Sequence, residues 1–153
     1  MRRPELISLP WLRFEIRISK LAIRNIVAMD KHELERRTKK FAVSVIRFVE
    51  DLPKSKTTDV LGYQLLKSGT SVGANYREAN RAESRADFIH KIGIVEKEIA
   101  ETQYWLELFE EVGHGESAAP KALLKESGEL LAIFIAIGKS TRANKPKPVI
   151  RKL

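Results

Sequence analysis

The sequence offers carboxylate and histidine side chains with spacings that could hold a metal ion. Glu98 and Glu101 lie three residues apart within a long helical pattern, like the carboxylates of helical bundles that bind two iron ions. Such a site also needs two Glu-x-x-His pairs that point inward from helix interiors. Glu111 and His114 have this offset, but Gly113 is expected to end the helix between them. We therefore predict no metal site.

Other enzymatic chemistry has no support in the residues. The chain contains no cysteine, which excludes thiolate zinc ligands, cysteine nucleophiles and a disulfide scaffold. No glycine-rich phosphate loop and no nucleophile elbow is present. We expect a protein that is not an enzyme and has neither catalytic residues nor a cofactor. The absence of cysteine and of a long apolar run favours a cytoplasmic location away from membranes.

Basic side chains are the remaining feature with chemical potential. The 153 residues include 28 Lys and Arg against 20 Asp and Glu, for a formal charge of +8. Residues 1–28 carry +4 and residues 139–153 carry +6, whereas residues 29–138 sum to −2. Because the excess lies at the two ends of the chain, the charge argues against nucleic-acid binding by the whole core.

The elements that must position these side chains are four helices. Apolar residues recur at three- and four-residue steps over the segments 31–52, 58–81, 85–112 and 120–142. Pro53 and Pro120 lie at the borders of these segments, and Ser84 followed by Asp87 resembles a capping box. Short connections make successive helices antiparallel. The predicted fold is all-α, an up-down-up-down antiparallel four-helix bundle over residues 29–142.

The two ends of the chain differ from this pattern. Within residues 1–28 an apolar and polar alternation from Leu12 to Ser19 indicates a strand, which has no partner in a helical bundle. Two interpretations stay open: a poorly ordered or non-native extension with Met29 as the functional start, or an arm that pairs with a neighbour. Residues 143–153 form a basic tail.

Antiparallel topology gathers much of the positive charge at one pole of the bundle. The start of the first helix, the turn between the second and third, and the end of the fourth meet there, with +13 against −5 for the rest of the chain. Such a pole could bind nucleic-acid phosphates, although basic runs are also common as solvated surface. The candidate residues are Arg36, Arg37, Lys39, Lys40, Arg77, Arg81, Arg85, Lys139 and Arg142.

Self-association is predicted from apolar surface beyond the core. Residues 130–137 are apolar all round the last helix, and a bundle helix normally keeps a solvated face. The interface candidates are Tyr104, Trp105, Ile133, Ile135 and Ile137. The alternative is a tightly packed monomer with the N-terminal arm across this patch. We favour a homo-oligomer, because large apolar patches usually mark interfaces.

A polar stripe on the second helix has two interpretations. Ser71, Asn75 and Glu78 follow at three- and four-residue steps, with Gly69 and Gly73 among them. The small residues allow close helix approach, and the polar groups could form a network with the third helix. We interpret the stripe as a structural polar seam rather than a partner groove, because buried polar groups are usually paired for structural reasons.

The order of motifs in residues 65–109 resembles one family. Asn75-Tyr76-Arg77-Glu78 is followed by Ser84-Arg85-Ala86-Asp87-Phe88 and then by Glu98, Glu101, Thr102, Tyr104, Trp105 and Leu106. This pattern is similar to that of the four-helix-bundle family also called 23S rRNA intervening-sequence proteins. The resemblance implies a bundle that assembles into a pentameric ring, with no known catalytic activity. Relatives include the accessory protein of diversity-generating retroelements, which acts beside a reverse transcriptase.

The functional expectation combines these features. The chain is expected to form a non-enzymatic, pentameric helical bundle whose basic pole binds RNA or DNA backbone as an accessory factor. Its partner would be a reverse transcriptase or another nucleic-acid enzyme. The alternative is a protein-interaction scaffold with no nucleic-acid role. No recognition helix or RNA-binding motif supports base-specific readout.

Overall fold

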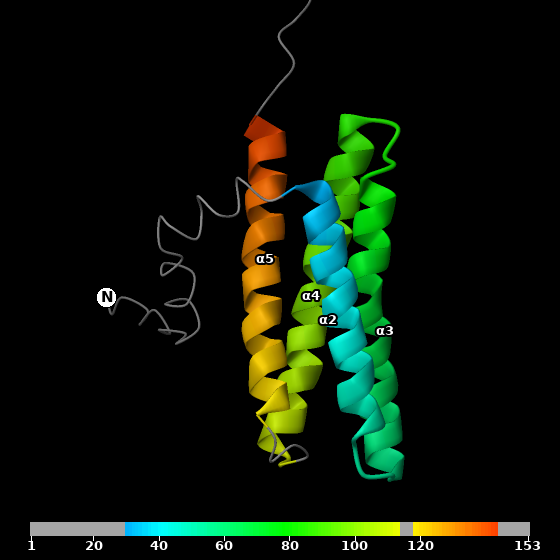
Figure 1. Cartoon of the computed structure of the whole chain (residues 1–153). Coiled ribbons are helices and arrows are strands. Elements are labelled where there is room, and N and C mark those ends of the chain that lie inside the picture. The colour runs from blue at the N-terminus through cyan, green and yellow to red at the C-terminus, as the bar shows by residue number, and fades with distance from the viewer. Residues whose placement is uncertain (1–29, 114–117, 144–153) are drawn as a thin grey trace, which may run out of the picture. The chain divides into compact units, whose positions relative to one another are not determined.

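The computed structural model describes residues 30–113 and 118–143, which form four helices. The chain divides into two units, Met1–Asp30 and Lys31–Leu153, and all four helices belong to the second. They are α2 (Lys31–Glu50), α3 (Lys56–Ala79), α4 (Arg85–Glu111) and α5 (Ala119–Ala143), and Figure 1 shows them side by side as a bundle. No strand occurs in these described ranges. The predicted all-α class and the four helices are confirmed.

Several predictions concern residues outside the described ranges. They are the strand pattern and the Met29 start in residues 1–29, and the basic tail beyond Ala143. These stay predictions.

Side-chain caps explain where the helices begin. Ser84 caps α4, because its Oγ accepts a hydrogen bond of 3.1 Å from the Asp87 N–H. A full capping box occurs at the start of α3, where Ser55 and Thr58 exchange backbone-to-side-chain bonds of 3.1 and 2.9 Å. Beyond the end of α4, Gly113 has φ +71°, the left-handed conformation predicted for this stop.

The core is formed by the predicted apolar stripes. Each helix packs against the next along the chain, and α2 also contacts α5, over a smaller area. Two edge-to-face aromatic pairs cross the interior, Phe48 with Phe109 at 5.5 Å and Tyr76 with Phe134 at 5.1 Å between ring centroids. The largest fully buried apolar side chains are Phe109, Phe134, Leu65, Ile92, Ile99, Leu106, Leu130, Val45, Val72 and Val95.

Buried threonines interrupt the apolar stripes without leaving polar groups unpaired. Thr38 is fully buried in α2, and its hydroxyl donates to the Leu34 carbonyl at 3.0 Å. Thr102 in α4 donates to the Glu98 carbonyl at 2.7 Å. Because each hydroxyl is satisfied within its own helix, its burial costs little. An apolar periodicity does not reveal these positions.

Glycine allows α3 to approach α2 closely. A Cβ at Gly69 would lie 2.9 Å from Val45 Cγ1 and 3.0 Å from Val45 Cγ2, closer than van der Waals contact permits. Val45 is fully buried and β-branched, so it has little freedom to move aside. The close helix approach predicted for the small residues of this helix is therefore confirmed at Gly69, and its partner is α2.

We predict opposite stability changes for two glycine-to-alanine variants. Gly69→Ala gains about 1 kcal/mol of helix propensity but incurs about 1–3 kcal/mol of overpacking against Val45, so its unfolding temperature falls. Gly93→Ala in α4 meets no atom within 4 Å and gains about 1 kcal/mol of stability from propensity alone. Thermal unfolding followed by circular dichroism measures both. A Gly69→Ala variant as stable as Gly93→Ala would contradict the close-approach argument.

Candidate nucleic-acid interface

Three contacts bring four helix ends together at one end of the bundle. Asn80, just after α3, donates to Glu35 near the start of α2 at 2.7 Å. Lys91 near the start of α4 pairs with Glu78 near the end of α3 at 2.6 Å. Arg85 at the start of α4 donates to the Thr141 carbonyl near the end of α5 at 2.9 Å. We call this region, formed by residues 30–43, 74–91 and 139–143, the basic end.

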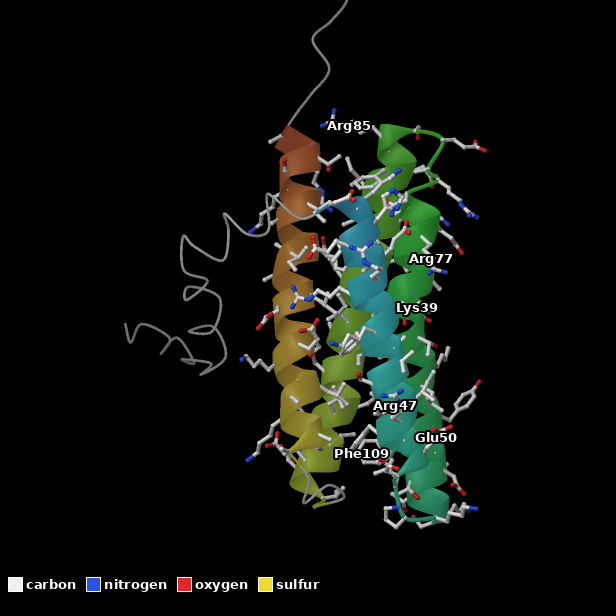
Figure 2. The ribbon with its side chains drawn as sticks, in the orientation of Figure 1. Lys39, Arg47, Glu50, Arg77, Arg85 and Phe109 are labelled. Atoms are coloured by element: carbon white, nitrogen blue, oxygen red, sulfur yellow. The ribbon has the colours of Figure 1, made fainter. Side chains whose placement is uncertain are left out.

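The basic end carries a clear excess of positive charge. It contains eleven Lys and Arg against six Asp and Glu. Seven of the nine predicted phosphate-binding residues have exposed side chains with no ion pair to any described residue: Arg36, Lys39, Lys40, Arg77, Arg81, Lys139 and Arg142. Figure 2 shows Lys39 and Arg77 along the sides of α2 and α3, while Arg85 lies at the tip. The exposed cations therefore lie along the sides of the helices as well as near their ends.

Arg37, one of the nine candidates, is already committed to a structural contact. Its guanidinium donates to both carboxylate oxygens of Glu126 at 2.7 and 2.9 Å and to Glu129 at 2.6 Å. The hydrogen bond to Glu126 is the main cause that raises the Arg37 pKa above its ordinary value, although burial acts in the opposite direction. The side chain is only 24% exposed. Arg37 ties α2 to α5 and has little left to offer a phosphate.

Arg85 has a second structural role at the tip. Its guanidinium donates to the carbonyls of Thr141 and Arg142 in the last turn of α5. The last carbonyls of a helix lack intrahelical partners and carry partial negative charge, so a cation there stabilises the helix end. Arg85 thus caps α5 from α4, a function that its position in a turn does not reveal.

The predicted interface residues fall into three environments. Ile133 is only 2% exposed and belongs to the core, because it lies on the side of α5 that is covered by the rest of the bundle. Ile135 and Ile137 are half-buried. Tyr104 is 53% exposed, and its ring packs edge-on against the half-buried Trp105 at 4.9 Å. Tyr104 is therefore the exposed member of the predicted patch and Trp105, Ile135 and Ile137 are half-buried, whereas the assignment of Ile133 to an outer surface is corrected.

The polar stripe on α3 is satisfied mainly within its own helix. The Ser71 hydroxyl donates to the Lys67 carbonyl at 2.7 Å, and the Asn75 amide donates to the Ser71 carbonyl at 2.9 Å. Of the three predicted seam residues, Glu78 makes the bond to α4, through Lys91. That bond raises the Lys91 pKa. These contacts give the stripe a structural role.

Glu98 on α4 is partly desolvated. Burial, followed by the nearby charge of Glu101, raises the Glu98 pKa above its ordinary value, while Lys97 and Lys67 act against this shift. Glu101 in turn accepts a hydrogen bond from the Trp105 indole at 3.3 Å. No group of three or more potential metal ligands lies together in residues 30–113 and 118–143.

A groove lies between α2 and α5, and apolar periodicity along a single helix does not reveal it. It has a volume of about 610 Å³ and extends along α2 from Arg37, within the basic end, past Arg47, which is labelled in Figure 2. Phe41, Phe48 and Leu123 form an apolar floor, and Lys40 and Arg47 line it from α2. Loose packing between two helices cannot be read from either helix alone.

In the described part of the chain, no helix combines the length and the apolar character that a membrane span requires.

We predict that removing the Arg37 charge weakens the fold rather than any external contact. Arg37→Met leaves Glu126 and Glu129 without their shared partner and should lower the free energy of unfolding by about 1–2 kcal/mol. The matched variant Arg36→Met removes an exposed charge and should change stability by less than about 0.5 kcal/mol. Urea unfolding at low and high salt measures both. Equal stability of the two variants would contradict a structural role for Arg37.

We also predict a pH-dependent gain from Glu98→Gln. The pKa of Glu98 is raised in the folded state, so the charged carboxylate destabilises the fold when the pH is above the ordinary pKa of glutamate. This cost is absent at low pH, where the group is protonated in both the folded and the unfolded state. The variant should unfold about 1–2 °C higher at pH 7 and match the wild type near pH 3.5. Exposed Glu83→Gln is the control, with little change expected. A gain that persists at low pH would argue for a packing effect instead.

Comparison with known proteins connects the chain to one protein family. No curated protein matches the chain at a significant level. The chain is similar to the crystal structure of a protein of unknown function from the S23 ribosomal protein family of Bacteroides thetaiotaomicron VPI-5482. The two share 37% identity with a TM-score of 0.67 over 72% of this chain and 99% of that chain. The sequence profile of the 23S rRNA-intervening sequence proteins matches residues 30–136, a range that begins just before α2 and ends within α5. The chain belongs to the 23S rRNA-intervening sequence protein family.

Proposed function

We propose that this protein is a non-enzymatic, self-assembling antiparallel bundle that binds nucleic-acid backbone through its basic end. It would act as an accessory factor to a reverse transcriptase or another nucleic-acid enzyme, in the cytoplasm. The observation that carries the proposal is the set of seven exposed Lys and Arg side chains that no described acidic residue neutralises. Free cations of this kind release condensed counterions when they meet phosphates.

Several features support backbone contact over base readout. The exposed cations come from α2, α3, the turn after α3, and α5, so they form a spread-out charged surface. The helices that carry them pack their apolar sides into the bundle and present no separate recognition element. The described family name refers to 23S rRNA, and the similar solved protein is assigned to a ribosomal protein family. RNA is therefore the first probe to use.

Assembly would increase the affinity of this surface. In a cyclic ring with parallel subunits, such as a pentamer, each copy adds its basic end to one shared face. Several weak contacts to one nucleic-acid strand then act together, and the second contact benefits from the high effective concentration created by the first. The charge difference between the two ends of each subunit would then become a charge difference between the two faces of the ring.

We predict that charge reversal at the basic end weakens nucleic-acid binding in a salt-dependent way. Arg77→Glu combined with Arg81→Glu removes two exposed cations while leaving the structural Arg37 and Arg85 intact. If both bind phosphates of one strand, the slope of log affinity against log salt should become less steep by about 1.4–1.8. Fluorescence anisotropy with labelled RNA and DNA oligonucleotides from 50 mM salt upward measures this.

The matched control changes the same amount of charge at the other end of α3. Lys54→Glu with Lys56→Glu alters two exposed lysines beside the α3 start, and binding should fall much less than in the Arg77 and Arg81 variant. Wild-type protein that binds neither RNA nor DNA near 50 mM salt refutes the nucleic-acid proposal and favours the protein-interaction scaffold. An equal loss in both double variants would refute the assignment to the basic end.

A further inference from the structure

The groove between α2 and α5 has the lining of a protein-docking site. Its floor contains aromatic and aliphatic side chains, Phe41, Phe48 and Leu123, that belong to the edge of the core. Ala119 and Ala122 line the α5 side, where their short side chains leave space for an occupant. A volume of about 610 Å³ accommodates several side chains and falls within the usual range of binding pockets.

The charges around this groove are unequal. Arg37 and Glu126 line it but neutralise each other through their ion pair. The remaining charged lining consists of Lys40 and Arg47 from α2 against Asp51. Lys40 and Arg47 are both exposed. The groove therefore favours an occupant that combines apolar side chains with acidic ones.

The last two turns of α4 together with its C-cap residue Val112 have this combination. Tyr104, Leu108 and Val112 follow at four-residue steps and so lie along one side of the helix. Tyr104 and Val112 are 53% and 55% exposed, and they are two of the five exposed large apolar side chains in the described ranges. Two exposed acids, Glu107 and Glu111, form the adjacent stripe. This surface, which we call the α4 acidic patch, comprises residues 104–112.

We propose that the α4 acidic patch of one copy docks into the α2–α5 groove of the next copy. Tyr104 would enter the apolar groove, and Glu107 and Glu111 would face Lys40 and Arg47. Exposed tyrosine and arginine side chains are frequent anchors of interfaces, and opposite charges set their orientation. This inference rests on the proposed self-assembly and names the two surfaces that join.

The two surfaces lie on different helices of the same chain, so the contact is heterologous. A heterologous contact repeats from copy to copy and produces a ring when the rotation closes. The groove overlaps the basic end at Arg37, Lys40 and Phe41, so its occupation takes up Lys40, but Arg77, Arg81 and Lys139 do not line it and stay accessible. Docking and nucleic-acid binding are therefore compatible in one particle.

Charge exchange tests the proposed pairing. Arg47→Glu and Glu111→Arg each place like charges across the contact, and each should raise the dissociation constant of the assembly at least tenfold. The double variant restores opposite charges and should recover most of the assembly. Tyr104→Ala should weaken it at least as strongly as either single reversal. Light scattering and sedimentation velocity across a protein dilution series measure the mass relative to the 17.4 kDa chain.

Lys125→Glu is the matched control, because Lys125 is exposed on α5 and does not line the groove. Circular dichroism confirms that each variant is folded. A second measurement uses the absence of native cysteine. Arg47→Cys combined with Glu111→Cys should give a ladder of covalent oligomers with a short bis-maleimide, whereas Lys125→Cys combined with Glu111→Cys should not.

The outcomes separate this inference from the function on which it rests. A wild-type protein that is monomeric at micromolar concentration refutes both the proposed self-assembly and this contact. A wild-type oligomer whose mass is unaffected by Arg47→Glu, Glu111→Arg and Tyr104→Ala refutes the contact alone. The same holds if Lys125→Glu dissociates the particle equally, or if the 47 and 111 cysteines give no ladder in an intact oligomer.

Discussion

The ion-pair cluster of Arg37 with Glu126 and Glu129 closes this bundle. It joins α2 to α5, the first and last helices of the bundle, whose mutual packing is the least extensive among neighbouring helices. Elsewhere the helices are held by continuous apolar stripes and by connections along the chain. Between α2 and α5 no described connection exists, so polar contacts contribute more to holding the two together.

This closure shapes both candidate surfaces. Toward the basic end, the guanidinium of Arg37 is used inside the protein, which separates it from the exposed Arg36, Lys39 and Lys40 on the same helix. From Arg37 toward the end of α2, the two helices leave the groove lined by Phe41, Phe48 and Leu123. If α2 and α5 packed tightly along their whole length, the groove would be filled and the ion pair would contribute less to holding the two helices together.

The fold was predictable because its determinants are local or repetitive. Apolar residues at three- and four-residue steps placed all four helices within two residues of their observed bounds, and Gly113 adopts the conformation expected at its stop. The small residues of α3 predicted a close helix contact such as that of Gly69 with Val45, although only the folded chain shows that α2 is the partner. The capping box at Ser55 was missed because Thr58, in place of the usual Glu, supplies the return bond.

The candidate site was predictable in composition but not in detail. Sequence alone located the basic segments, because charge counts need no coordinates. It could not separate Arg77 and Arg81, which are exposed, from Arg37 and Arg85, which bind groups more than fifty residues away along the chain. In the same way, Ile133 lies in a stretch that is apolar all round the helix, and only the orientation of α5 in the bundle shows that this residue belongs to the core.

The amino-acid order thus determined which segments become helices, where they stop and which ends of the chain are basic, since these properties arise from short-range spacing and composition. Tertiary packing determined which cations remain free, which apolar side chains stay exposed and where two helices leave a groove. Those properties depend on helix rotation and on contacts between distant residues, and no periodicity along one helix contains that information.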